Sequence, residues 1–208
     1  MYEEDTLAAA LYWFDCQWEG KPIAYLYAIA TDTAFRNKGY CRKLLADTHL
    51  HLQKLGYAGC ILVPREAALF GMYEKLGYRT CSCVRTFSCA AADTPVPLKE
   101  ISMEEYASLR RQFLPIGGVL QEGAALALLR AYSNFYAGEN MLLAAYPEEG
   151  KLTVCELLGS PDNFCGVVAA LGYNKGTIRT PGQDKPFAMY HSLTEDAATP
   201  EYFGLALD

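Results

Sequence analysis

Hydrophobic and polar positions change their period twice in the first part of the chain. Residues 7–14 and 22–31 are rich in aromatic and β-branched side chains, and turn-forming residues lie between them. This pattern predicts a strand, a hairpin turn and a second strand. A polar loop over residues 32–39 ends in glycine. Across residues 40–55 the apolar positions recur at helical spacing, and Gly56 ends the predicted helix.

The next segment alternates strand and helix on a shorter scale. Residues 59–63 predict a buried strand that Pro64 ends, and residues 66–76 predict a helix that a glycine ends. A further strand is expected over residues 78–88. The first half therefore has the order strand, strand, loop, helix, strand, helix, strand. The small, polar, proline-containing stretch 90–97 predicts a linker after it.

The second half begins with a helix-capping signal. Ser102 followed by Glu105 forms a capping box, and Ser160 followed by Pro161 is an N-cap with proline at the first helical position. The predicted helices cover residues 102–114, 123–136 and 160–172. The predicted strands cover residues 139–146, 151–158, 176–180, 186–193 and 201–207.

An internal echo links the two halves. Residues 55–64 end a helix with Leu-Gly-Tyr and begin a strand that stops at proline, and residues 171–181 do the same. Two copies of one α/β unit explain the echo. A common helix C-cap with a hydrophobic follower explains it equally well. These residues alone do not decide between the two explanations.

The composition is that of a globular protein, and the charge distribution identifies one basic segment. Of the 208 residues, 51% are hydrophobic and 20% are charged, which is an ordinary globular balance. Residues 1–95 carry as many acidic as basic side chains, so the net charge of −6 arises in residues 96–208. One short acid-free segment of the neutral half contains four basic residues, Arg36, Lys38, Arg42 and Lys43. A focused basic segment on an acidic protein favours a small anionic ligand and argues against nucleic acid.

The eight cysteines have no C-x-x-C spacing, and only three histidines accompany them. We therefore expect neither a structural zinc site nor another metal site. The longest uncharged apolar run, residues 22–30, is too short to cross a membrane. Residues 1–5 lack the features of a secretory leader. We expect a cytoplasmic chain with reduced, mostly buried thiols and no membrane partner.

The segment from Arg36 to Lys43 carries the clearest chemical signal. It joins a predicted strand to a predicted helix, where successive backbone N–H groups converge and the helix dipole adds positive charge. Gly39 allows the main chain to approach a ligand because it has no Cβ. These features suit a pyrophosphate, although the segment is neither a Walker A nor a dinucleotide-binding motif. The alternative is a solvated basic loop that caps a helix.

Tyr73 is the second candidate, on a predicted helix four residues before Gly77. A tyrosine at such a position packs in the core with one hydroxyl partner, or it acts as a general acid near a reacting thiol. Without further context, packing is the commoner role.

Together, these two segments resemble the GNAT superfamily of N-acetyltransferases. The acyl-CoA motif of that superfamily, R/Q-x-x-G-x-G/A, is matched by Arg36-Asn-Lys-Gly-Tyr-Cys41, with Cys41 in place of the final Gly or Ala. The later motif, close to L/F-Y-E-K-L-G-F/Y, is matched by Met72-Tyr-Glu-Lys-Leu-Gly-Tyr78. The match covers residues 22–88.

With the echo, the chain also resembles tandem GNAT proteins similar to the enhanced intracellular survival acetyltransferase. The resemblance implies an α/β fold of two GNAT-like units with mixed, mostly antiparallel central sheets. The first unit, residues 1–92, would bind acetyl-CoA. The degenerate second unit, residues 93–208, lacks the basic loop and is not expected to bind it. The usual first strand and two helices of the first unit, and a sterol-carrier-like domain, are missing from this sequence.

The resemblance also implies a role for each matched residue. Acetyl-CoA would be the cosubstrate, contacted by Ile29, Ala30, Thr31, Arg36, Asn37, Lys38, Gly39, Tyr40, Cys41 and Arg42. Backbone groups of residues 29–31 would hold the pantetheine arm and polarise the thioester carbonyl, and residues 36–42 would hold the pyrophosphate. Tyr73 would protonate the departing thiolate. The terminal carboxylate of Asp208 would be the base, unless Asp208 is only a frayed terminus.

The implied activity is N-acetylation of a primary amine of a small molecule. The acidic second half would favour a cationic acceptor, unless its acids are only solvated surface residues. A non-catalytic acyl-CoA-binding or regulatory module is the alternative, because the missing helices usually wall the acceptor site. The second unit, or another subunit of a homo-oligomer, would complete that wall, or the chain is a truncated relative. A redox role for Cys81 and Cys83 has less support, because neither thiol has a neighbour that clearly activates it.

Overall fold

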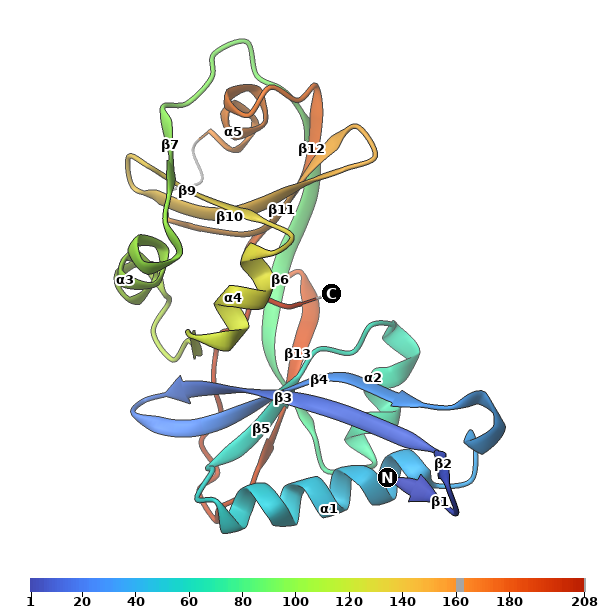
Figure 1. Ribbon diagram of the computed structural model, residues 1–208. Helices are drawn as coiled ribbons and strands as arrows, with labels where there is room; N and C mark the ends of the chain where they lie inside the picture. The colour runs from blue at the N-terminus through green and yellow to red at the C-terminus, as the bar shows by residue number, and fades with distance from the viewer. Residues whose placement is uncertain (160–162, 208) are drawn as a thin grey trace.

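A computed structural model describes residues 1–159 and 163–207 of the protein (Figure 1). Its helices are α1 (Tyr40–Lys54), α2 (Ala67–Glu74), α3 (Met103–Phe113), α4 (Ala124–Arg130) and α5 (Phe164–Ala170), with a 3-10 turn η1 (Thr33–Phe35). Its strands are β1 (Tyr2–Glu3), β2 (Thr6–Leu7), β3 (Ala9–Trp18), β4 (Lys21–Thr31), β5 (Gly59–Leu62), β6 (Arg79–Ala90), β7 (Leu98–Ile101), β8 (Leu120–Gln121), β9 (Asn134–Gly138), β10 (Met141–Glu148), β11 (Lys151–Gly159), β12 (Lys175–Pro181) and β13 (Lys185–Ser192). Within these described ranges, no helix is both long enough and apolar enough to cross a membrane.

Eleven strands form a single sheet in the order β7-β9-β10-β11-β12-β6-β13-β5-β4-β3-β8, and β1 and β2 form a separate hairpin. Most neighbouring strands run antiparallel, whereas the pairs β4–β5 and β11–β12 run parallel. The predicted α/β fold with a mixed, mostly antiparallel sheet is confirmed.

The first half follows the hydrophobic pattern closely. The turn of the β3–β4 hairpin is formed by Glu19 and Gly20, both with positive φ, which matches the twist of the flanking strands. Helices α1 and α2 end where Gly56 and Gly77 adopt φ of +86° and +87°. Side chains of both helices pack with Leu26 and other apolar residues of the strands in one hydrophobic cluster.

The two halves share one arrangement of elements. In the first, β3 pairs antiparallel with β4, and α1 connects β4 to the parallel strand β5. In the second, β10 pairs antiparallel with β11, and α5 lies between β11 and the parallel strand β12. The echo in the sequence therefore corresponds to a repeated structural unit.

Strands of both halves are interleaved. β13 belongs to the second half but lies between β5 and β6 of the first. The long strand β6 pairs with β13 and β12 and so runs through both parts of the molecule (Figure 1). Residues of the predicted linker bond to the second half, since the amides of Ala92 and Val96 donate to the carbonyls of Cys165 and Gly166. The proposed division after residue 92 stays a prediction.

One predicted helix is too long. The helix expected over residues 123–136 ends at Arg130, and residues 134–138 form β9 between β7 and β10. The ring of Phe135 stacks on Tyr106 with centroids 4.1 Å apart. Tertiary pairing and this buried contact override the local helical spacing.

The strand expected over residues 201–207 is also wrong. The structure shows only an isolated bridge between Tyr202 and Gly118 there. The tail 203–207 forms hydrogen bonds to side chains in place of a strand ladder. The amide of Phe203 donates to the hydroxyl of Ser82, and that hydroxyl donates to the carbonyl of Phe203. The side-chain amide of Gln121 donates to the carbonyl of Leu205. The predicted cap at Ser160 and Pro161 lies outside the described residues, and the described helix α5 is capped by Asn163.

Candidate active site

A cleft opens where two parallel strands separate. β4 and β5 pair only from Ile23 to Tyr25 on the β4 side, and the remainder of β4 diverges from β5. The cleft has a volume of about 560 Å³. It is lined by Tyr25, Leu26, Tyr27, Ala28, Ile29, Ala30, Leu62, Val63, Arg65, Leu69, Tyr73 and Leu207. Peptide groups of β4 beyond Tyr25 can therefore face a ligand instead of a neighbouring strand.

An irregularity in β4 lies at the mouth of this cleft. The register with β3 shifts between Ala10 and Tyr12, opposite Ala28, which has φ of +50°. A non-glycine residue with such a φ is strained by about 1 kcal/mol or more and is found mainly where function demands it. The shift is a β-bulge that turns the peptide groups around Ala28 out of the regular ladder.

The basic segment lies at the start of α1. Gly39 has φ of +85°, and no side chain caps the helix. The first helical hydrogen bond runs from the amide of Lys43 to the carbonyl of Gly39, so the amides of residues 40–42 precede the helical ladder. Arg36, Lys38 and Arg42 are exposed, and within the described residues none of them forms an ion pair. This helix start can receive an anion.

The helix start adjoins the cleft. The Nε atom of Arg36 donates to the carbonyl of Thr31 at 3.2 Å, which ties the basic segment to the end of β4. Cys41, in the first turn of α1, packs in the same hydrophobic cluster as Ile29 and Tyr73. The structure thus brings the predicted contact residues on β4, the basic segment and Tyr73 to one site.

Tyr73 faces the cleft from α2. Its side chain is buried and lies edge-to-face against Tyr78, with ring centroids 5.7 Å apart. Burial, and to a smaller degree the nearby Cys41, raises the pKa of Tyr73 to about 12. The phenol therefore keeps its proton at neutral pH and can donate it.

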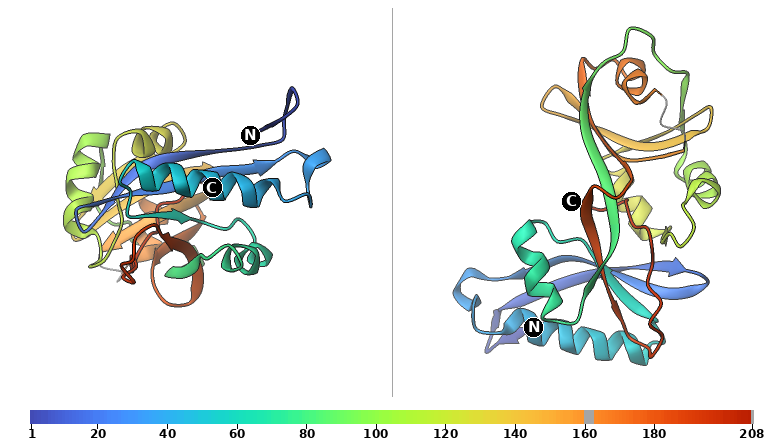
Figure 2. Two further views of the ribbon diagram at one scale, coloured as in Figure 1. Left: turned by 90° about the horizontal axis from the view of Figure 1, so that it is seen from below. Right: turned by 180° about the vertical axis from the view of Figure 1, so that it is seen from behind.

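The C-terminal tail reaches the same cleft. The amide of Leu207 donates to the hydroxyl of Tyr25 at 3.0 Å, and Leu207 lines the cleft. Seen from behind, the described part of the C-terminal tail lies beside β13 in the region where the two halves meet (Figure 2). Asp208, the base implied by the resemblance, lies outside the described residues.

A buried ion pair that the sequence analysis did not identify holds this tail. Arg110 of α3 and Glu156 of β11 are fully buried and form two parallel hydrogen bonds of 2.8 and 2.9 Å. The hydroxyls of Tyr106 and Tyr202 also donate to the carboxylate of Glu156. Glu156 in the middle of the otherwise apolar segment Val-Cys-Glu-Leu-Leu was the available signal, because a lone acid there needs a buried partner.

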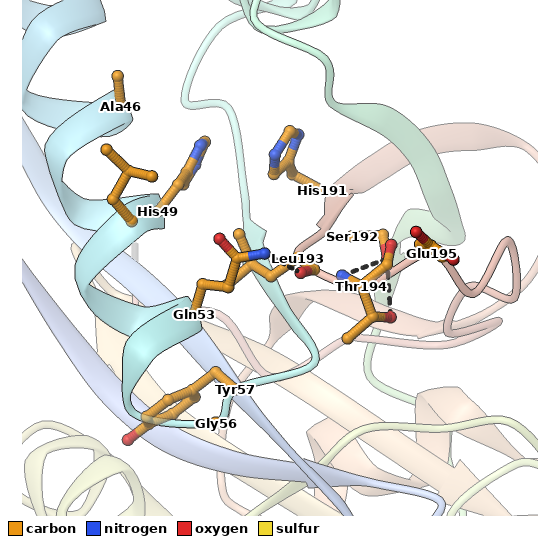
Figure 3. A pocket seen from close by; sticks show the side chains of 11 residues that line it. Ala46, His49, Gln53, Gly56, Tyr57, His191, Ser192, Leu193, Thr194 and Glu195 are labelled. Carbon is orange, nitrogen blue, oxygen red and sulfur yellow. Dashed lines mark hydrogen bonds between the residues drawn. The ribbon is translucent and has the colours of Figure 1, made fainter.

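A second hollow adjoins the C-terminal half of α1. It has a volume of about 850 Å³ and lies between α1 and the end of β13 (Figure 3). The rings of His49 and His191 stack there with centroids 4.2 Å apart, and Nε2 of His49 lies 2.7 Å from the hydroxyl of Tyr78. Burial, together with the neighbouring His191, lowers the pKa of His49 to about 4.

Stability should therefore fall in mild acid. The pKa of His49 is lower in the folded chain than its ordinary 6.5, so unfolding takes up a proton as the pH drops from about 6.5 towards about 4. The His49→Gln variant should show a smaller difference in unfolding free energy between about pH 7 and about pH 5, measured by urea titration. His51→Gln, on the same helix, is the control and should retain the wild-type difference.

Comparison with known proteins identifies the class of fold. A model of the family described as FR47-like protein matches residues 6–86, from β2 into β6. A GCN5-related N-acetyltransferase from Kribbella flavida shares 16% identity and a TM-score of 0.65, over 92% of this chain and 59% of that one. The Eis1 protein of Mycobacterium abscessus shares 13% identity and a TM-score of 0.67, over 95% and 64%. A tandem GNAT protein from the clavulanic acid biosynthesis pathway shares 8% identity and a TM-score of 0.55, over 94% of this chain and 82% of that one.

The protein therefore has the GNAT acetyltransferase fold. At these identities the likeness concerns the fold. The chain spans about three-fifths of the length of the Kribbella flavida and Mycobacterium abscessus structures. No curated protein matches the chain.

Proposed function

We propose that the protein is an acetyl-CoA-dependent N-acetyltransferase that acts on the primary amine of a small molecule. The observation that carries this proposal is the cleft between β4 and β5, which Tyr73 lines and beside which the uncapped start of α1 lies. The similar protein from Kribbella flavida is named a GCN5-related N-acetyltransferase, which supports acyl transfer as the reaction.

Each part of the cleft fits one part of acetyl-CoA. The amides at the start of α1 and the side chains of Arg36, Lys38 and Arg42 suit the pyrophosphate, because an open helix N-terminus and basic side chains both favour negative charge. Asn37, Gly39, Tyr40 and Cys41 provide the backbone of this segment. The peptide groups of residues 29–31 suit the pantetheine arm and the thioester carbonyl.

The proposed reaction is direct attack of a neutral amine on the thioester. A C–N bond forms, the C–S bond breaks, and the proton of Tyr73 passes to the departing sulfur. The attacking nitrogen loses one proton, which returns through water to the Tyr73 phenolate and restores the phenol. Most amines are protonated near neutral pH, so a base must first remove a proton. The carboxylate of Asp208 is proposed as that base, since the preceding residue, Leu207, lines the cleft.

Binding and catalysis can be separated by a simple pair of measurements. Acetyl-CoA should raise the melting temperature of the protein, and a panel of small amines should show whether free CoA thiol is released in an amine-dependent way. Thermal stabilisation without any amine-dependent release would instead identify a non-catalytic acyl-CoA-binding module.

The Gly39→Ala variant should bind acetyl-CoA on the order of ten-fold more weakly. An alanine at φ of +85° is strained by about 1 kcal/mol, and relief of that strain would turn the amides of the helix start away. Isothermal titration with acetyl-CoA measures the effect.

Gly56→Ala provides the matched control at the other end of α1. Gly56 has φ of +86°, and an added Cβ would meet no atom within 4 Å, as at Gly39. Both variants should lose similar stability, whereas only Gly39→Ala should lose affinity. Equal affinities would show that the helix start does not hold the cosubstrate.

A further inference from the structure

A groove with a different lining lies beside the cleft. It has a volume of about 530 Å³ and shares Val63 and Arg65 with the cleft. Leu69 and Tyr73 of α2 face the cleft, whereas Ala67, Phe70 and Glu74 of the same helix face this groove. Its other wall is built from β6, β12 and β13. We call it the basic groove, after the three residues Arg65, Arg179 and Lys185 in its lining.

Positive charge prevails in the basic groove. Three cationic side chains line it, whereas Glu74 is the one carboxylate among its described lining residues. Arg65 and Lys185 are exposed, and no ion pair is found for either within the described parts of the chain. Their charges are therefore directed to solvent or to a ligand.

The third cation is held in place. Nη1 of Arg179 donates to the carbonyls of Cys155 and Gly204 at 3.3 and 3.4 Å, and its guanidinium lies 4.5 Å from the ring centroid of Phe187. Phe187 and Val84 are buried and give the groove an apolar floor. A rigid guanidinium beside an apolar surface suits an anionic group on a short hydrocarbon chain.

We propose that the basic groove binds an anionic group, a carboxylate or a phosphate, of the acceptor amine. This proposal rests on the proposed acetyltransferase function, because it places the amine in the cleft and the anionic group beyond Arg65. The net charge of the second half favours a cationic acceptor, yet the second-half residues described in this groove include Arg179 and Lys185 and no acid. A ligand in the groove would contact these basic side chains directly, whereas the acids of the second half are distant and screened by salt.

Matched amines test this inference. The measurement is acetyl-CoA-dependent release of CoA thiol with 5-aminopentanoate and pentylamine, with O-phosphoethanolamine and ethanolamine, and with spermidine. Within a pair, the anionic amine should have a kcat/KM at least about ten-fold higher. The pair with the larger ratio of kcat/KM shows whether the groove prefers a carboxylate or a phosphate. Equal or faster reaction of the partners that lack the anionic group, or of spermidine, would overturn the anion site and leave the acetyltransferase standing.

A variant of the groove locates the effect. Lys185→Gln should raise KM for the anionic amine about ten-fold, with little change in KM for the partner that lacks the anionic group. Lys99→Gln is the control, because Lys99 is an exposed residue of β7 whose amine bonds to Glu105. An equal loss for both partners of a pair would argue against an anion site.

A binding measurement decides the case if no amine reacts. Calorimetric titration of the products 5-acetamidopentanoate and N-pentylacetamide requires no turnover. Preferential binding of the acid by the wild-type protein, weakened in Lys185→Gln, would support the anion site even while the acetyltransferase function failed. Equal binding of the acid and the uncharged amide would overturn the anion site on its own.

Discussion

Removing one partner of the buried pair between Arg110 and Glu156 should lower the free energy of unfolding by about 3–5 kcal/mol. Both side chains have no exposed surface, and their two hydrogen bonds are short and parallel. Burial alone would lower the pKa of Arg110, but Glu156 raises it overall, so the guanidinium stays charged. The Glu156→Leu variant would leave this charge unpaired in the interior, which is the origin of the large effect.

The double variant separates the charge from the packing. In Arg110→Met with Glu156→Leu, neither charge remains buried, so much of the stability lost in the single variants should return. Urea unfolding of the wild type, both single variants and the double variant gives the coupling energy. A double variant as unstable as the sum of the two single variants would show that the ions contribute independently.

Arg111→Met is the matched control on the same helix. Arg111 pairs with Glu122 through two hydrogen bonds of 2.7 and 2.8 Å, but its side chain is 61% exposed. Loss of such a surface pair should cost about 1 kcal/mol or less. A comparable loss in Arg111→Met and Arg110→Met would mean that burial does not determine the effect.

The same ion pair connects the fold to the site. Tyr202 donates to the carboxylate of Glu156, and five residues later Leu207 lines the cleft. Arg179 and Gln121 bind carbonyls of the tail between these two points. Residues that face away from the cleft thus hold the tail up to Leu207, which is why their substitution should also lower activity.

The sequence predicted helix boundaries correctly where a glycine or a capping residue at the boundary determines them. Gly39, Gly56 and Gly77 mark helix boundaries because each adopts a positive φ there, and this preference is visible in the sequence. The capping box at Ser102 is likewise confirmed, since its side chain accepts from the amide of Glu105.

Elements determined by distant partners were not predictable in this way. β9 lies in a segment of helical spacing and becomes a strand because β7 and β10 pair with it. The bulge at Ala28 leaves no signal, because alanine has no preference for positive φ. The partner of Glu156 is 46 residues away in the chain, so the buried acid could be noticed in the sequence but not paired.

The Tyr73→Phe variant should lower kcat on the order of 100-fold, and it should bind acetyl-CoA as the wild type does. A positioned general acid contributes about 10²–10⁴-fold to the rate, and the phenylalanine keeps the ring in its contact with Tyr78. Amine-dependent release of CoA measures kcat, and isothermal titration measures the affinity. Tyr132→Phe is the control, because Tyr132 is 70% exposed and follows α4, away from the cleft.

The pH dependence distinguishes a proton donor from a packing residue. Because the pKa of Tyr73 is raised to about 12, the phenol stays protonated from about pH 7 to about pH 10, and kcat should show no alkaline fall from this group over that range. Unchanged turnover in Tyr73→Phe would make Tyr73 a packing residue. An alkaline fall near about pH 9 that disappears in Tyr73→Phe would show instead that the phenol ionises far earlier than its burial requires.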